Sequence, residues 1–409
     1  MRNAMRALIA SVALCVIAVG SSTSPAGAQK KYDPGASDTE IRIGNIMPYS
    51  GPASAYGTIG KAQAAYFRMI NEQGGINGRK INFISYDDGY SPPKTVEQAR
   101  KLVEGDEVLL IFQSLGTAPN SAIQKYMNAR KVPQIFVATG ATKWGDPKNF
   151  PWTMGFQPNY QSEGRIYAKY ILDKHPAGKI AVLFQNDDYG KDVLKGVRDG
   201  LGDKNAMIVA EMPYEPADPT VDSQIVRLKA SGADIFINIT TPKFAAQAIK
   251  KVAELGWKPL HILNNVSASI GSVLRPAGFE NARGIITTTY LKDPTDPALA
   301  RDPGLMAWTA FMDKYYPEGD KTNSSNVSAH ATAALLVQVL KQCGDNLTRE
   351  NVMRQAANLK DVELEMLMPG IKVNTSPKDY FPLEELQMRR FSGERWESFG
   401  PIMSGEIGS

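Results

Sequence analysis

Residues 109–121 read LLIFQSLGTAPNS, an apolar run that stops at Gln113 and continues in small polar residues. A continuously apolar run is typical of a strand that is covered on both faces, as in parallel sheets. Ligands of open parallel sheets bind beyond the carboxyl ends of the strands. The stretch therefore fits two interpretations: an ordinary strand end, or a site where hydroxyls and backbone N–H groups hold a small molecule.

Short apolar runs alternate with amphipathic stretches along most of the chain. The predicted strands are 41–47, 81–88, 108–112, 132–138, 179–185, 207–212, 234–239 and 259–263. The predicted helices are 58–73, 96–104, 118–130, 160–173, 192–201, 221–230 and 242–255. This alternation predicts βαβ units and parallel sheets. It runs twice, over about 40–150 and 160–290, which indicates two similar α/β lobes, and 300–358 is predicted to be mostly helical.

The segments that follow the predicted strands are rich in Ser, Thr, Asn, Gly and Tyr and poor in His, Cys and Lys. They include PYSG (48–51), ATGATKW (138–144), NITTPK (238–243) and NNVSAS (264–269). Such groups suit hydrogen bonding to a small molecule better than chemical conversion of it. The strand ends therefore favour a binding site.

Sequence signals for catalysis are weak. The three histidines, His175, His261 and His330, are widely spaced. The chain has no nucleophile elbow, no P-loop and no G-x-G-x-x-G after the first predicted strand. We therefore expect no catalytic residues, no cofactor and no enzymatic activity.

Two paired carboxylates, Asp87-Asp88 and Asp187-Asp188, each close a predicted strand and enter a turn. Paired carboxylates can bind a metal ion or act as acid and base. Aspartate is also favoured in turns and helix caps. We expect this structural role and no metal site, and a surface calcium site stays open.

The first 28 residues have the pattern of a secretory signal peptide. Arg2 and Arg6 precede an apolar run, and Ala26-Gly27-Ala28 forms a small-x-small cleavage signal. We therefore expect export to the periplasm. The remaining chain keeps a single cysteine, Cys343, which cannot form an internal disulfide.

The formal net charge of the whole chain is +4, and removal of Arg2 and Arg6 brings it closer to neutral. A nearly neutral chain gives no reason to propose a nucleic-acid or membrane-surface partner.

Several motifs, in order, resemble those of one family. They are IRIGNIMPYSGP (41–52), INEQGGINGRKI (70–81), YDD (86–88), SLGT (114–117), VPQIFVATGAT (132–142) and NDDYGKD (186–192). The chain resembles the periplasmic substrate-binding proteins of ABC transporters, in the branched-chain amino-acid-binding (type I) group. The resemblance covers nearly all of the chain after residue 28.

The resemblance implies a type I periplasmic binding protein fold. This is an α/β fold of two similar lobes, each a mostly parallel sheet with helices on both faces, joined by three crossing segments. The crossings are expected near residues 157, 286 and 370. Lobe 1 is then 39–157 plus 287–370, and lobe 2 is 158–286 plus 371–409. The ligand is expected in the cleft, where it favours the closed form.

The resemblance also places a ligand carboxylate at two loops of the first lobe. The candidate residues there are Ser114, Leu115, Gly116, Thr117, Ala138, Thr139, Gly140 and Thr142. Gly116 permits close backbone approach, and a helix that begins near Ala118 would direct N–H groups at the anion. A simple turn or cap role for each residue stays open.

The chain departs from the amino-acid-binding pattern in the second lobe. Family members that bind amino acids carry an acid after the strand that matches 259–263, but here the loop reads LNNVSAS (263–269). A buried ammonium without a carboxylate would be costly. We therefore expect an aromatic or otherwise apolar organic acid. The remaining candidate ligand-binding residues are Tyr49, Tyr56, Tyr160, Tyr189, Thr241 and Asn265.

Together these observations predict a monomeric solute-binding protein that binds a small-molecule carboxylate and docks on a membrane permease. Two alternatives keep the binding role: a protein for a branched-chain amino acid or an amide, and a ligand sensor for a membrane receptor. A secreted hydrolase would need a nucleophile and a base that the sequence does not reveal.

Overall fold

The computed structural model describes residues 30–405, so the predicted signal peptide lies outside the described residues. The first lobe contains a five-stranded parallel sheet in the order β3-β2-β4-β5-β6. Its strands are β2 (Glu40–Met47), β3 (Lys80–Asp87), β4 (Leu110–Phe112), β5 (Gln134–Val137) and β6 (Thr153–Gly155). Four of them match strands that the sequence predicts, and β6 was not predicted.

The second lobe contains a seven-stranded sheet in the order β14-β13-β11-β10-β9-β7-β8. Its strands are β7 (Ile180–Gln185), β8 (Ile208–Tyr214), β9 (Ile235–Ile239), β10 (Leu260–Leu263), β11 (Ile286–Thr289), β13 (Glu385–Phe391) and β14 (Trp396–Ser404). The strands from β8 to β11 are parallel, whereas β13 and β14 are antiparallel to their neighbours. Sequence analysis did not predict β11, β13 or β14.

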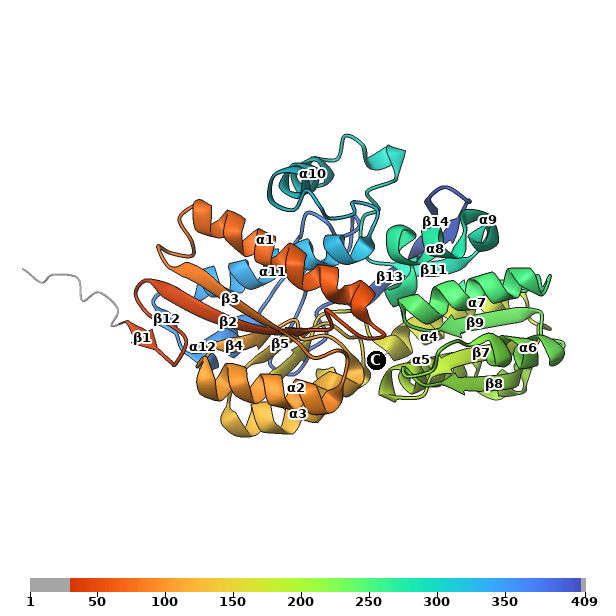
Figure 1. The fold of residues 1–409 in the computed structure, drawn as a ribbon, viewed down its shortest axis with the longest axis horizontal. Coiled ribbons are helices and arrows are strands. Elements are labelled where there is room, and N and C mark those ends of the chain that lie inside the picture. Colours follow the sequence, from red (N-terminus) through yellow and green to blue (C-terminus); the bar gives the residue numbers. More distant parts are fainter. Residues whose placement is uncertain (1–29, 406–409) are drawn as a thin grey trace, which may run out of the picture. The chain divides into compact units, whose positions relative to one another are not determined.

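Both sheets carry helices on both faces, as predicted (Figure 1). On the first sheet, α1 (Thr58–Glu72) and α11 (Ser324–Cys343) cover one face, and α2 (Pro92–Arg100) and α3 (Thr117–Arg130) cover the other. On the second sheet, α4 (Tyr160–Lys174) and α5 (Asp188–Leu201) lie opposite α6 (Asp222–Ala230) and α7 (Pro242–Glu254).

The alternation of side chains along β7 illustrates why both faces must be covered. Ile180 and Val182 pack in the core beneath α4 and α5, whereas Ala181 and Leu183 pack beneath α6 and α7. Successive side chains of a strand point to opposite faces, so a strand that is apolar at every position needs helices on both sides.

The segment 300–358 is helical, as predicted. It contains α10 (Pro303–Tyr315), all of α11, and α12 (Arg349–Ala356). Helix α11 belongs to the first lobe and packs against α1. Two short helices, α8 (Arg275–Ala277) and α9 (Phe279–Ala282), precede β11. The lobe boundaries at 157, 286 and 370 stay a prediction. Within residues 30–405, no helix is both long and apolar enough to cross a membrane.

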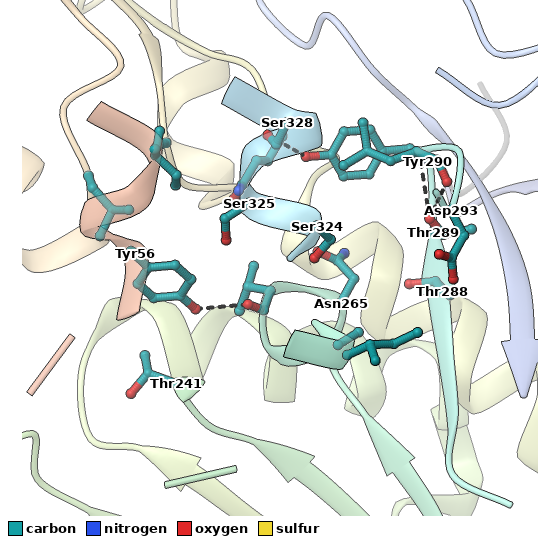
Figure 2. A pocket seen from close by; sticks show the side chains of 18 of the residues that line it. Tyr56, Thr241, Asn265, Thr288, Thr289, Tyr290, Asp293, Ser324, Ser325 and Ser328 are labelled. Atoms are coloured by element: carbon teal, nitrogen blue, oxygen red, sulfur yellow. Dashed lines mark hydrogen bonds between the residues drawn. The ribbon is translucent and has the colours of Figure 1, made fainter. Parts of the chain in front are cut away.

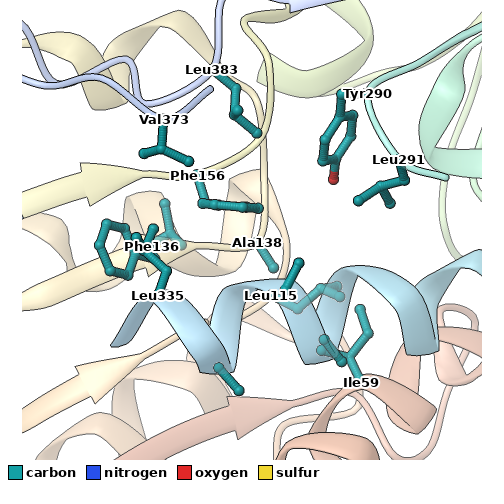
Figure 3. Close-up of a cluster of buried hydrophobic side chains, with 14 of the residues drawn as sticks. Ile59, Leu115, Phe136, Ala138, Phe156, Tyr290, Leu291, Leu335, Val373 and Leu383 are labelled. Carbon is teal, nitrogen blue, oxygen red and sulfur yellow. The ribbon is translucent and has the colours of Figure 1, made fainter. Parts of the chain in front are cut away.

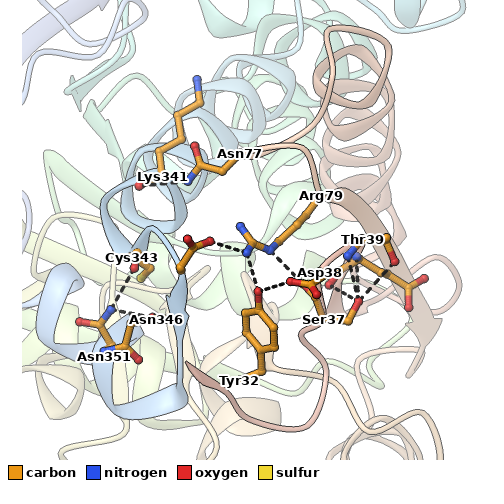
Figure 4. A network of polar contacts seen from close by, with 12 residues as sticks. Tyr32, Ser37, Asp38, Thr39, Asn77, Arg79, Lys341, Cys343, Asn346 and Asn351 are labelled. Atoms are coloured by element: carbon orange, nitrogen blue, oxygen red, sulfur yellow. Dashed lines mark hydrogen bonds and ion pairs between the residues drawn. The ribbon is translucent and has the colours of Figure 1, made fainter. Parts of the chain in front are cut away.

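A polar network fastens the beginning of the described chain to the first lobe (Figure 4). The two-residue strands β1 (Lys31–Tyr32) and β12 (Asn346–Leu347) pair in parallel. The Arg79 guanidinium donates to the Tyr32 hydroxyl at 2.6 Å, to Asp345 at 2.6 Å and to the Ser37 carbonyl at 2.9 Å. Nearby Cys343 is buried, and burial raises the pKa of its thiol to about 12, so the thiol is unreactive at neutral pH.

The two helices α4 and α5 approach each other closely at glycines. A Cβ atom on Gly164 would clash with the backbone of Val193 and Val197, and one on Gly196 would clash with the backbone of Gln161. Both clashes involve backbone atoms, which a rotamer change cannot relieve. The glycines therefore fix the distance between the helices that position the tyrosines at their amino ends.

We predict that Gly196→Ala lowers the free energy of unfolding by about 1–3 kcal/mol, because overpacking forces the two helices apart. Gly105→Ala is the matched control, since nothing lies within 4 Å of the position of its Cβ. Urea unfolding of both variants measures the difference. Equal midpoints for the two variants would contradict the proposed close packing.

Candidate functional site

A cavity of about 80 Å³ lies between the lobes, at the carboxyl ends of strands from both sheets. A single water molecule needs roughly 10–15 Å³ by the same measure, so the space suits a small molecule. Figure 2 shows part of its lining, with Tyr56 and Thr241 on one side and Asp293 on the other. The position agrees with the rule for ligand sites of parallel α/β sheets.

Nine of the fourteen predicted binding residues line this cavity. Those from the first lobe are Tyr56, Leu115, Gly116, Thr117 and Ala138, and those from the second are Tyr160, Tyr189, Thr241 and Asn265. The other five, Tyr49, Ser114, Thr139, Gly140 and Thr142, lie outside the lining. The structure thus brings most of the candidates together, and their role in binding stays a prediction.

Helix α3 begins at the cavity. Gly116 has a φ of 98° and precedes the first helical residue, Thr117. This φ is readily available only to glycine. The Gly116 N–H donates to the Ala138 carbonyl at 3.4 Å, so it already has a partner. The first N–H groups of a helix have no acceptor within the helix, and such groups can donate to an anion.

The Thr139 hydroxyl lies behind Thr117. The two hydroxyl oxygens are 2.6 Å apart, and the indole N–H of Trp144 donates to Thr139 at 3.4 Å. Both threonines are buried. Thr139 therefore orients Thr117 from outside the cavity.

Thr142 links the two lobes. Its backbone N–H and its hydroxyl donate to the Asp192 carboxylate in α5, at 2.7 and 2.9 Å. Of the other candidates outside the lining, Tyr49 bonds Ser85 at 2.6 Å, and Gly140 packs against Tyr160. The buried Ser114 hydroxyl has no hydrogen-bond partner among the described residues.

Tyrosine side chains form one side of the cavity. The rings of Tyr160 and Tyr189 are 5.2 Å apart at an interplanar angle of 60°. The Tyr56 hydroxyl donates across the cleft to the Val266 carbonyl at 2.9 Å. Tyr90 also lines the cavity, and its hydroxyl accepts from Gln185 at 3.2 Å. Sequence reasoning missed Tyr90, although it follows a predicted strand as the other tyrosines do.

Apolar side chains complete the lining next to α1 and α11 (Figure 3). Ile59, Leu115, Ala138, Tyr290 and Leu291 belong to both the cavity and the main hydrophobic core. An apolar group of a ligand gives up no hydrogen bonds when it is buried against this wall. The wall therefore favours an apolar portion of a ligand.

Comparisons with known proteins agree with this architecture. A family model described as periplasmic binding protein matches residues 40–390. This chain belongs to the periplasmic binding protein family. Among its relatives, "Leu/Ile/Val-binding protein homolog 7" of Brucella abortus is 24% identical over 86% of this chain and 86% of the relative. The Leu/Ile/Val-binding protein of Escherichia coli is 26% identical over 66% of this chain and 76% of the relative.

Solved structures of the same fold include two that are named for different ligand classes. One is a branched chain amino acid ABC transporter protein from Thermus thermophilus with bound valine. It has a TM-score of 0.79 and 16% identity, and the match covers 90% of this chain and 96% of that one. The other is a fatty acid ABC transporter substrate-binding protein from Thermomonospora curvata, with a TM-score of 0.74, 21% identity, and coverage of 92% and 95%. At these identities the likeness establishes the type I fold alone.

The second lobe of this periplasmic binding protein contains a buried acid that sequence reasoning missed. The Glu163 carboxylate in α4 accepts from the Asn265 backbone N–H at 2.7 Å, from the Thr288 hydroxyl at 3.2 Å, and from the Tyr167 hydroxyl. Its Oε2 has no hydrogen-bond partner among the described residues. The loop 263–269 itself has no acid, as read from the sequence, but Glu163 lies directly behind it.

The acids and histidines outside the cavity have structural roles. Asp187 caps α5 by accepting from Tyr189 and Gly190, and Asp87 accepts from the backbone of Tyr49 and Ser50. His261 and His330 are buried, and burial lowers their pKa values to about 3 and about 4. Among the described residues, no group of three or more His, Cys, Asp or Glu side chains has the geometry of a metal site.

The ionisation of Glu163 should make the stability of the protein depend on pH. Burial raises the pKa of its carboxyl from 4.5 to about 6, so ionisation of the folded protein is costly. The wild type should lose about 2 kcal/mol of stability as the pH rises through this window, because one pKa unit corresponds to about 1.4 kcal/mol. Glu163→Gln lacks this ionisation.

We therefore expect the stability of Glu163→Gln, relative to wild type, to increase by about 2 kcal/mol between pH 4 and pH 7. Urea unfolding at several pH values measures the difference, and Glu280→Gln at an exposed glutamate is the control. A difference that is constant with pH would show that folding does not change the pKa of Glu163, and would contradict the prediction.

Proposed function

We propose that this protein is the periplasmic solute-binding component of an ABC importer and that it binds a small carboxylate. The favoured ligand is an aromatic or otherwise apolar organic acid. One observation carries the proposal: a small cavity between two lobes, lined by the start of α3, by tyrosine rings and by apolar side chains. The helix start suits the carboxylate, and the rings and the apolar wall suit the rest of the ligand.

The partner is a membrane permease, and the protein acts as a monomer with one ligand. The Thermus and Thermomonospora proteins are named as parts of ABC transporters, which supports a transport role. The cavity offers hydrogen-bonding and apolar groups, and the sequence contains no paired nucleophile and base, so binding without conversion is the favoured activity.

Closure of the cleft is the proposed mechanism. Several hydrogen bonds join the lobes around the cavity, including those from Tyr56 to Val266 and from Thr142 to Asp192. A ligand that contacts both lobes adds interactions that exist only when the lobes are together. It therefore shifts the population toward the closed form, which docks on the permease.

A branched-chain amino acid is the second candidate. The curated relatives are named Leu/Ile/Val-binding proteins, and Glu163 supplies a carboxylate behind Asn265 and Thr288, which both line the cavity. An ammonium near these two residues would be stabilised by that charge. Glu163 itself does not line the cavity, so this candidate ranks second.

A thermal-shift screen of the purified protein separates the two candidates. The panel contains benzoates, phenylpropanoates, aliphatic acids, leucine, valine and small amides. A ligand at a hundredfold excess over its Kd should stabilise the protein by about 2.7 kcal/mol. We expect shifts with apolar or aromatic acids. Shifts with leucine or valine alone would favour the second candidate, and no shift with any carboxylate would reject the proposal.

Thr117→Val tests the position of the carboxylate. Loss of its hydroxyl should weaken binding of the acid found in the screen by about 1–3 kcal/mol, because the anion loses a buried donor. Ser121→Ala is the control, since Ser121 bonds the Thr117 carbonyl in the same helix but does not line the cavity. Calorimetric titration measures both. Equal affinities of the two variants would remove Thr117 from the site.

A further inference from the structure

A group of polar side chains lines the cavity opposite the tyrosines. Figure 2 shows Asp293 on the opposite side of the cavity from Tyr56 and Thr241. Arg389 and Trp396, from β13 and β14, also line the cavity. These residues belong neither to the predicted carboxylate site nor to the contacts among the tyrosines.

The start of α3 belongs to the tyrosine side. Gly116 packs against the ring of Tyr90, whose hydroxyl bonds Gln185, and Gln185 in turn accepts from the Thr241 hydroxyl at 3.4 Å. A ligand carboxylate at Thr117 would therefore lie on the side of the cavity that Tyr90 and Thr241 line, opposite Asp293. The cavity offers polar groups at two separate places.

Asp293 and Arg389 face each other without a hydrogen bond. The Arg389 Nη1 is 4.0 Å from the Asp293 Oδ2, and the two side chains are only 7% and 13% exposed. Oδ1 of Asp293 accepts from the backbone N–H of Thr295 at 2.9 Å and from its hydroxyl at 2.8 Å. Oδ2 of Asp293 and Nε of Arg389 are buried and have no hydrogen-bond partner among the described residues.

Neighbouring groups do not supply the missing partners. Lys292, which also lines the cavity, is bound by both carboxylate oxygens of Asp302, at 2.7 and 2.8 Å. The Arg389 guanidinium lies over the Trp396 ring, 4.7 Å from its centroid. That contact holds the guanidinium in place. The Trp396 ring accepts no hydrogen bond from the N–H groups at the edge of the guanidinium.

Buried charged groups without hydrogen-bond partners lower the stability of the protein. A bound group that pairs with both Asp293 and Arg389 would recover this loss. Burial lowers the pKa of Arg389 to about 10, so Arg389 stays protonated at neutral pH. A ligand ammonium would be attracted by Asp293 but repelled by Arg389. A neutral group that both donates and accepts matches the two together.

We propose that Asp293 and Arg389 form a second polar subsite, which takes a hydroxyl or carboxamide group of the ligand. This inference rests on the proposed function, in which the carboxylate of the same ligand lies at the start of α3. The hydroxyl or amide N–H donates to Asp293, and its oxygen accepts from Arg389. The preferred ligand is therefore an organic acid with an apolar middle and a neutral polar group at its far end.

Matched probes test the subsite by calorimetric titration. The pairs are 3-phenylpropanoate with 3-(4-hydroxyphenyl)propanoate, and hexanoate with 6-hydroxyhexanoate. The corresponding carboxamides extend the series, and 3-(4-aminomethylphenyl)propanoate supplies a charged comparison. We expect at least one hydroxyl or carboxamide probe to bind the wild type at least tenfold more tightly than its unsubstituted partner and than the ammonium probe.

The double variant Asp293→Leu/Arg389→Met should abolish this preference while it still binds the unsubstituted acid. Replacement of both members of a buried pair by apolar groups preserves folding more often than removal of one. Asp293→Asn serves as a second, nearly isosteric variant, in which the preference should fall. The control is Asp313→Leu/Lys321→Met, at an exposed ion pair outside the cavity, which should keep the wild-type preference.

The neutral probes 4-methylphenol and hexan-1-ol distinguish failure of this inference from failure of the proposed function. Equal binding of substituted and unsubstituted acids, or preference for the ammonium probe, would overturn the subsite and leave the carboxylate site standing. Binding of neutral hydroxyl probes alone, lost in the Asp293→Leu/Arg389→Met variant, would support the subsite and overturn the carboxylate proposal. Absence of binding by every probe would overturn both.

Discussion

Helices cover both faces of both sheets. Because the strands are buried on both sides, polar groups of the sheets can reach a ligand only beyond the strand ends. In β7, alternate side chains are buried beneath two different pairs of helices. The carboxyl ends of strands from both lobes border the same cavity. Backbone N–H groups, hydroxyls and tyrosines therefore gather there, because no other part of the buried strands can expose them.

Buried polar groups without partners are the main energetic cost of this arrangement. Oε2 of Glu163, Oδ2 of Asp293 and the Tyr189 hydroxyl lack hydrogen-bond partners among the described residues. A protein core normally pairs such groups, since each unpaired one costs stability. Two of these three residues line the cavity, where a ligand can supply the missing partner. In the proposed binding site, a ligand of complementary chemistry would recover the cost of these unpaired groups.

The loops that border the cavity also hold the lobes together. Thr142 ends the second of the predicted carboxylate loops, yet it bonds Asp192 in the second lobe. Tyr56 lines the cavity and at the same time donates across the cleft to Val266. Ligand contacts and lobe contacts therefore share the same short segments. In the proposed closure mechanism, the free energy of ligand binding would act on the segments that join the two lobes.

Local sequence patterns were enough to predict most strands and helices of both lobes and the strand end at 109–121. The candidate binding residues, nine of which line the cavity, came from the strand ends together with the family resemblance. The periods of strands and helices, and the residues that end them, are set by neighbours in the chain. Asp293 and Arg389 carried no such signal. Arg389 looks like an ordinary strand residue until β13 pairs with β11 and Trp396 packs over it. Glu163 looks like a helix-surface acid until the loop after β10 donates to it. Tertiary structure alone decided these positions, because burial and partners depend on segments about 100 residues apart in the chain.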